Sequence, residues 1–236
     1  MRRHLLRAVT AAPCLAAVLA CAACAGGPAG TAPDAARGPA APSGNAAAPP
    51  PDGAAGDGLP RGFTRAGGPG SGLTFGVPRS WVALEATGHG LERRLTRAGL
   101  TDKQIHRAET GLEPVAARDG IWAFDPGSMS RSPHRFTTGL TAGCRSGAAS
   151  AGQLLASAVR RLEPLRGRVV RAGTVQVAGG AAVRVGYVFT VGGVRLHGLR
   201  LLLPAPGDRT CVLTLSTDDA ARRGLLERIG RTLRPL

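Results

Sequence analysis

The chain has 236 residues and a formal net charge of +15, and only 3% of its residues are aromatic. Lys103 is the sole lysine, so arginine supplies nearly all of the positive charge. Away from the N-terminus, no apolar run reaches the roughly 18 residues that span a bilayer, which excludes a polytopic membrane protein. The length allows one domain with appendages.

Residues 1–20 have the pattern of a secretory signal peptide. Arg2, Arg3 and Arg7 precede an apolar segment of about a dozen residues, which ends in small residues. A cysteine directly after such a segment is typical of the bacterial lipobox, where the signal is cut before the cysteine and the thiol receives diacylglycerol. We therefore expect an exported lipoprotein, held on the outer face of the cytoplasmic membrane.

Two cysteines compete for the lipid. Cys21 has the aliphatic Val18 three positions before it, as the lipobox prefers, and is our expected attachment site. Cys24 is the alternative, because cleavage there would discard Cys14 and Cys21 and leave an even number of cysteines. A redox role for Cys21 and Cys24 needs a folded context that a signal sequence lacks. A secretory signal without a lipid is the remaining alternative.

The segment 21–60 is expected to be a disordered tether. Between 25 and 60, 28 of 36 residues are Ala, Gly or Pro, and Leu59 is the only large apolar residue. Such a segment cannot bury enough surface to offset the entropy lost on ordering. A flexible chain of this length has a root-mean-square span of roughly 30–35 Å.

Periodic apolar residues begin at Leu73 and continue to Leu233, so we assign residues 61–236 to one globular domain. The glycine-rich stretch 67–72 lacks the Lys-Ser/Thr of a phosphate loop and is assigned to the linker. The first half of the domain alternates between strands and helices. The pattern predicts strands over 72–85 with a break at Pro78, two helical pieces over 91–112, strands over 121–124 and 136–144, and a helix over 153–162.

The second half of the domain predicts a meander followed by a helix. Its four strands are expected over 169–177, 181–191, 194–203 and 210–216, with turns at two Gly-Gly pairs and at 204–208. A final helix begins near Asp218 and carries Leu225, Leu226, Ile229 and Leu233 on one side. This order of elements indicates an α+β fold with an antiparallel β-sheet flanked by helices.

Several of these residues carry a family resemblance. They are Phe75-x-Val77-Pro78-x-x-Trp81, Ala182-x-Arg184 with Tyr187, the strand 212–216, and the closing helix around Ile229. In these features the region 72–236 resembles PsbP-like domains, including LpqN-like actinobacterial lipoproteins. The resemblance implies a PsbP-like sheet and a non-catalytic binding module. It provides no catalytic residues to carry over.

Cys144 and Cys211 are the cysteines of the predicted domain. Each falls on a strand and on its apolar face. In an oxidising compartment such a pair commonly forms a disulfide, and we expect one here. For the loop between Cys144 and Cys211 that the bond would close, the chain-entropy model gives a stabilisation of about 4 kcal/mol. Two buried free thiols are the alternative.

Positive charge provides the main lead to a partner. Residues 61–236 hold 26 basic and 12 acidic side chains. The densest basic run consists of Arg160, Arg161, Arg166, Arg168 and Arg171. We favour arginine-rich composition, spread evenly over a solvated surface, as the explanation of this charge. The alternative is that the run attracts an anionic surface such as a wall polymer or lipid headgroups. Aromatic stacking platforms are absent, so nucleic acid is not an expected partner.

No motif indicates catalysis. His106 and Glu109 are spaced for a helical metal site but lack a third ligand, so we expect no metal and no cofactor. Asp218 and Asp219 are interpreted as a helix N-terminal pair. The sequence therefore predicts a lipid-anchored, non-enzymatic envelope module that binds a protein or an anionic polymer. The alternatives are an extracytoplasmic hydrolase with an unrecognised site and a purely structural lipoprotein.

Overall fold

The computed structural model describes residues 58–85, 91–97, 99–117 and 119–236. The expectations for the signal peptide, for Cys21 and Cys24, and for most of the tether lie outside these residues. No helix in the described ranges is long and apolar enough to cross a membrane.

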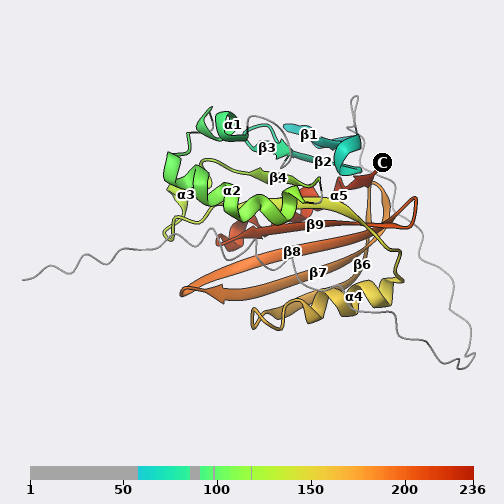
Figure 1. Cartoon of the computed structure of the whole chain (residues 1–236). Helices are drawn as coiled ribbons and strands as arrows, with labels where there is room; N and C mark the ends of the chain where they lie inside the picture. The colour runs from blue at the N-terminus through green and yellow to red at the C-terminus, as the bar shows by residue number, and fades with distance from the viewer. Residues whose placement is uncertain (1–57, 86–90, 98, 118) are drawn as a thin grey trace, which may run out of the picture.

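Seven strands form the main sheet, and every neighbouring pair is antiparallel. In spatial order they are β3 (Val82–Glu85), β4 (Ile121–Phe124), β5 (Gly139–Ser146), β9 (Arg209–Thr217), β8 (Val194–Ala205), β7 (Gly180–Val191) and β6 (Arg168–Val177). The predicted meander is present as β6 to β9, and β9 pairs with β5. The α+β class with an antiparallel sheet flanked by helices is confirmed (Figure 1).

A second, three-stranded sheet joins the two ends of the described chain. It contains β1 (Phe63–Gly68), β2 (Leu73–Pro78) and β10 (Arg234–Pro235), with β2 in the middle. The strand pattern 72–85 is therefore divided between two sheets, since β2 and β3 pair with different partners.

Each face of the main sheet is covered by different elements. On one face, α5 (Arg223–Arg231) and the small sheet pack on side chains such as Leu213 and Leu215. On the other face, α1 (Leu91–Arg97) and α2 (Asp102–Ala116) cover β3 and β4. On that same face, α4 (Ala151–Arg160) covers β6 to β8. The two helical covers are therefore separated along the sheet.

The start of α4 shows how local sequence determines an element. The Ser150 hydroxyl accepts a hydrogen bond from the Gln153 backbone N–H, and the Gln153 side chain accepts one from the Ser150 backbone N–H. This capping box satisfies two N–H groups that the first turn leaves without partners. Leu154, Ala158 and Leu162 follow at helical spacing and are buried, as the apolar stripe predicts.

The glycine-rich stretch 67–72 is part of a β-hairpin, which corrects its assignment to the linker. Gly67 and Gly68 end β1, and a 3-10 turn over Pro69–Ser71 leads into β2. Gly67 has a φ of 91°, and a Cβ there would lie 2.3 Å from the Leu73 carbonyl oxygen. The glycines thus permit a close turn that other residues would block.

Candidate functional site

A hollow of about 70 Å³ opens on the main sheet between α2 and α4. Its floor comes from β5 and β9, the central strands that lie between the two helical covers. Thr141, Gly143, Val212 and Thr214 form this floor, while the alternate residues of both strands point into the core on the opposite face. The hollow therefore exists because two helices cover the ends of one sheet face and leave its middle open.

One row of directly opposed residues crosses the sheet at the hollow. In spatial order its members are Leu84, Trp122, Thr141, Thr214, Arg200 and Val185. Opposed residues of neighbouring antiparallel strands project from the same face. The outer members of the row are apolar and buried under the helices, whereas Thr141, Thr214 and Arg200 line the hollow. The row is thus polar only where it is uncovered.

Three arginines from three different elements line the hollow. Arg145 comes from β5, Arg200 from β8, and Arg161 is the C-cap of α4. All three are half-buried. No Asp or Glu of the described chain is among the lining residues. Guanidinium groups and threonine hydroxyls are donors that suit a phosphate or a carboxylate, and partial burial strengthens such contacts.

The structure divides the predicted basic run between the two faces of the sheet. Arg161 lines the hollow, and Arg160 and Arg166 are exposed near the end of α4. Arg168 and Arg171 lie opposite Val188 and Gly186 of β7. These positions alternate with Tyr187, which packs under α4, so both arginines project from the other face. The run does not form one surface.

Sequence reasoning missed Arg145 and Arg200. Each lies on a strand far from the basic run, and neither belongs to a dense cluster. One signal was available for Arg200: it interrupts the run of leucines 199–203 in β8. An arginine within an apolar strand usually has a specific partner or role.

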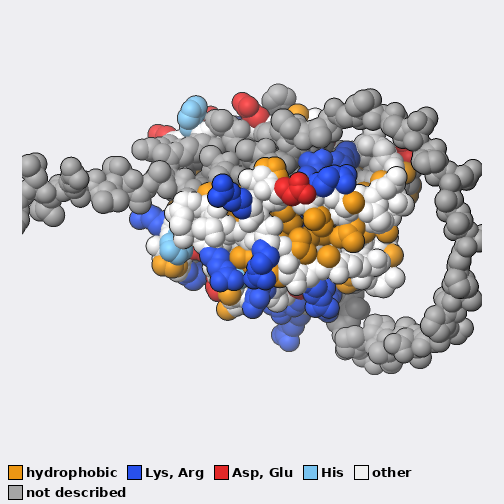
Figure 2. Space-filling view, turned by 90° about the horizontal axis from the view of Figure 1, so that it is seen from below, with side chains coloured by type: hydrophobic (Ala, Val, Ile, Leu, Met, Phe, Trp, Pro, Cys, Tyr) orange, Lys and Arg blue, Asp and Glu red, His pale blue; other side chains and the backbone are white. Residues whose placement is uncertain are grey.

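Positive side chains also gather outside the hollow. Figure 2 views the molecule from below, which is the side of α4 in Figure 1, and shows basic side chains beside a patch of apolar ones. Basic groups outnumber acidic groups on this face. An anion that approaches the hollow would therefore meet a positive potential before contact.

Cys144 and Cys211 are joined by a disulfide, as the sequence predicts. They lie directly opposite each other on β5 and β9. Cys144 also lines the hollow. The covalent link therefore joins the two strands that supply the floor threonines, Thr141 and Thr214, and holds them in register.

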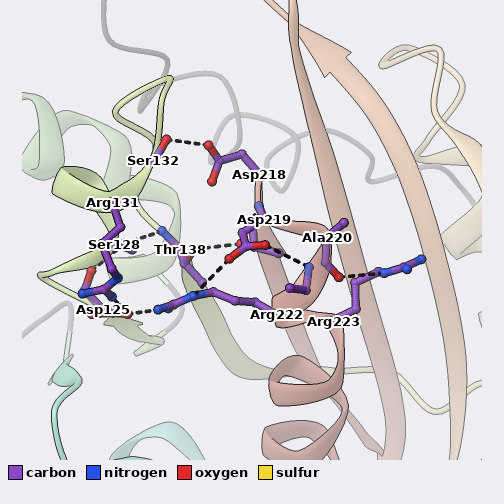
Figure 3. A network of polar contacts seen from close by, with 12 residues as sticks. Asp125, Ser128, Arg131, Ser132, Thr138, Asp218, Asp219, Ala220, Arg222 and Arg223 are labelled. Atoms are coloured by element: carbon purple, nitrogen blue, oxygen red, sulfur yellow. Dashed lines mark hydrogen bonds and ion pairs between the residues drawn. The ribbon is translucent and has the colours of Figure 1, made fainter.

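A second polar cluster lies between α3 (Ser128–Arg131) and the connection from β9 to α5 (Figure 3). The buried carboxylate of Asp125 accepts hydrogen bonds from Arg131 and from Arg222, each at 2.5 Å. Ser132 donates to the carboxylate of Asp218 at 2.5 Å. Because each of these carboxylates has a partner from a distant segment, the cluster joins two loops of the fold.

The predicted role of Asp218 and Asp219 at a helix start is present in part. Asp219 is the N-cap of the 3-10 turn Ala220–Arg222, and its carboxylate accepts a hydrogen bond from the Ala221 backbone N–H at 2.9 Å. The turn leads directly into α5, so the regular helix begins five residues later than Asp218.

The histidines are dispersed. His106 lies with Glu109 on the exposed side of α2, and His134 is exposed in a loop. His89 lies outside the described residues. Within the ranges that the structure describes, no group of three or more His, Cys, Asp or Glu side chains is arranged to hold a metal ion.

The environment of His197 perturbs its protonation. His197 lies on β8, on the face opposite the hollow, between Arg195 and Leu199. Burial lowers the pKa of His197, the nearby charges of Arg223 and Arg195 lower it further, and Asp219 partly opposes them. Its imidazole is therefore neutral under conditions in which an exposed histidine would be partly charged.

Comparisons with known proteins find similarity in structure alone. No protein family and no curated protein matches the sequence. The cyanobacterial PsbP (CyanoP) of Synechocystis sp. PCC 6803 is 12% identical with a TM-score of 0.46, over 78% of this chain and 99% of its own. LpqN of Mycobacterium tuberculosis, a protein involved in cell envelope biogenesis, is 14% identical with a TM-score of 0.45, over 73% and 90%. These two structures are of the PsbP-like and LpqN-like kinds that the sequence resembles.

Proposed function

We propose that the chain is an exported, lipid-anchored accessory protein of the cell envelope, whose folded domain binds an anionic polymer. The export signal over 1–20, acylation at Cys21 and the tether over 21–60 place the domain on the outer face of the cytoplasmic membrane. The Cys144–Cys211 disulfide supports this location, because disulfides form and persist in oxidising compartments.

The observation that carries the binding role is the convergence of three guanidinium groups on the threonine-floored hollow. Arg145, Arg161 and Arg200 come from separate elements, so only the fold brings them together. Arginine binds phosphate and carboxylate oxygens through paired N–H donors. A hollow that opens onto a sheet face admits one charged group of a long chain, while the rest of the polymer follows the basic surface around it.

The lining of the hollow favours binding over hydrolysis. A hydrolase needs a nucleophile with a general base, or a metal-bound water. The described lining residues supply hydroxyl and guanidinium donors, and the sulfur of Cys144 is held in the disulfide. Neither an imidazole nor a carboxylate is among them. These groups bind and orient an anion without removing a proton from water.

The binding test uses inorganic polyphosphate and two adjacent arginines at the end of α4. Arg161 lines the hollow, whereas Arg160 is exposed beside it. Losing one charge-assisted contact costs about 1.5–3 kcal/mol, so Arg161→Gln should raise the dissociation constant by roughly tenfold or more. Arg160→Gln should change it less than about threefold. Isothermal titration calorimetry of the exported full chain measures the dissociation constants of both variants.

Two results would contradict the proposal. An equal loss for Arg160→Gln and Arg161→Gln would mean that diffuse charge, and not the hollow, binds the polymer. Shortening of the polyphosphate during incubation, read on a gel, would support the hydrolase alternative.

A further inference from the structure

We propose that a second basic surface, on the opposite side of the main sheet from the hollow, docks the domain on anionic lipid headgroups of the membrane. We call it the basic sheet face and define it by Arg168 and Arg171 of β6, Arg195 of β8 and Arg223 at the start of α5. It is separate from the hollow, so it does not depend on the polymer-binding proposal.

Strand register places three of these arginines on one face. Arg171 lies opposite Gly186, and Arg195 lies opposite Thr190. Arg168 lies opposite Val188, which in turn lies opposite His197. Gly186, Val188 and Thr190 are alternate residues of β7, so all three arginines project from the same side.

Arg223 joins this group from the edge of α5. Its charge acts on His197, which lies in the same row as Arg168 and Val188. Its Nε donates to the Ala220 carbonyl oxygen, which fixes the stem of the side chain at the helix start. The start of α5 therefore adds the positive charge of Arg223 to the basic sheet face.

Acidic side chains next to this face are few and partly engaged. Glu227 of α5 pairs with Arg184 of β7 at 3.2 Å. Asp219 caps the 3-10 turn and contacts Arg222 at 3.6 Å. Within the described chain, none of the four arginines of the basic sheet face forms an ion pair with either carboxylate. Their charge is therefore available to a partner.

The shape of the face indicates what kind of partner it fits. Between the arginines lie Gly186, Val188 and Thr190, which are alternate residues of β7 with small side chains. Strands lie about 4.8 Å apart, and Arg195 lies two residues along β8 from His197, so the backbones of Arg168 and Arg195 are roughly 12 Å apart. Arginines spread over a sheet face at this spacing can each meet a different phosphate. They suit an array of headgroups, to which juxtamembrane arginines are attracted.

The position of the N-terminal end supports a membrane as the occupant. The small sheet containing β1 packs on the same side of the main sheet as the basic sheet face. The described chain therefore enters the fold on this side, and 57 residues precede it. With the lipid anchor proposed above, a chain attached to a bilayer by that segment can bring this side to the bilayer while the hollow faces away.

The experiment compares the same anchored protein on two bilayers. The full chain is reconstituted in phosphatidylcholine vesicles, with or without about 30% phosphatidylglycerol. Phenylglyoxal then modifies accessible arginines, and mass spectrometry gives the extent at each position. Arg93 and Arg94, which are exposed on α1 over the other sheet face, serve as internal references.

We expect modification of Arg168, Arg171 and Arg195 to fall at least threefold on the anionic vesicles, and to recover at about 0.5 M salt, where charge is screened within a few ångströms. Modification of Arg93 and Arg94 should stay the same. The double variant Arg171→Ser/Arg195→Ser should lose the protection of Arg168, whereas Arg93→Ser/Arg94→Ser should keep it.

Three outcomes would overturn the proposal. Equal modification on both bilayers would mean that this face does not contact headgroups. Equal protection of the α1 arginines would mean nonspecific adsorption of a basic protein. Protection by added polyphosphate on neutral vesicles, without protection by anionic lipid, would identify a soluble polymer as the occupant. None of these results bears on the effect of Arg161→Gln, so the two proposals fail separately.

Discussion

Arg222 donates a hydrogen bond to the carboxylate of Asp125, a residue 97 positions earlier in the chain. The same carboxylate oxygen accepts a second hydrogen bond, from Arg131. Asp125 follows the last residue of β4, and Arg222 precedes α5. One buried carboxylate therefore joins both ends of the segment that contains the meander and α4.

Removal of this carboxylate should destabilise the fold. Asp125→Asn leaves the two arginines without their shared counter-charge, and breaking a buried ion pair typically costs about 3 kcal/mol or more. Because Arg131 is largely exposed, we expect a loss of about 2–3 kcal/mol in the free energy of unfolding. Urea denaturation measures it. Glu163→Gln, at an exposed position, should change stability by less than about 0.5 kcal/mol. An equal effect of both variants would mean that the cluster does not stabilise the fold.

The disulfide should contribute strongly to stability, because it closes a long loop. Cys144 and Cys211 are 67 positions apart. The chain-entropy model gives about 4 kcal/mol for a loop of this size, so Cys144→Ala/Cys211→Ala should lower the free energy of unfolding by about that amount. Reductant should destabilise the wild-type chain only. Intact mass should rise by about 2 Da on reduction. A wild-type protein unaffected by reductant would contradict this.

The stability of the fold should depend on pH through His197. The pKa of His197 is lowered in the folded state from its ordinary value of 6.5, so between these two values the unfolded chain binds more protons than the folded one. Stability should therefore fall as the pH drops through 6.5, and the loss is complete below the lowered pKa. In urea denaturation between pH 7.5 and about 4.5, the free energy of unfolding should fall less with pH for His197→Gln than for the wild type.

His134→Gln is the matched control for His197, since His134 is exposed. It should follow the wild-type pH dependence. If His197→Gln showed the same dependence as the wild type, another group would be responsible for it.

Two glycines of α5 should respond in opposite ways to alanine. A Cβ at Gly230 would lie 2.6 Å from the Leu201 Cδ1 atom in the core, so Gly230→Ala should cost about 1–3 kcal/mol. A Cβ at Gly224 meets nothing within 4 Å, and alanine favours the helix, so Gly224→Ala should stabilise by up to about 1 kcal/mol. Thermal unfolding of both variants checks the packing of α5 against β8. Equal shifts in the midpoint would show that α5 does not pack closely there.

The lipid anchor has its own test. Cys21→Ala should move the protein from the membrane fraction to the soluble fraction, because the acyl chains are lost. Cys24→Ala should leave it in the membrane fraction, as an immunoblot of both fractions would show. If Cys24→Ala alone released the protein, the acylated residue would be Cys24 and not Cys21. Retention of both single variants would mean that neither cysteine alone carries the anchor.

Local patterns in the sequence determined most of the elements. Alternation of apolar residues located β6 to β9, and their short turns required them to be neighbours. Helical spacing located α4 and α5. Cys144 and Cys211 could be paired from the sequence, because few cysteines were available and both fell on apolar strand faces. Each of these inferences depends on residues close together in the chain, or on very few candidates.

Only the tertiary structure decided what forms the candidate sites. Arg145 and Arg200 come to the same hollow as Arg161 because β5 pairs with β9, the neighbour of β8, and no local pattern specifies the pairing of β5 with β9. The five arginines of the basic run are close together in the sequence, but the pleat of β6 turns Arg168 and Arg171 away from α4. The sequence shows how many arginines the chain has. Strand register and the position of the covering helices determine which of these arginines lie on the same face of the domain.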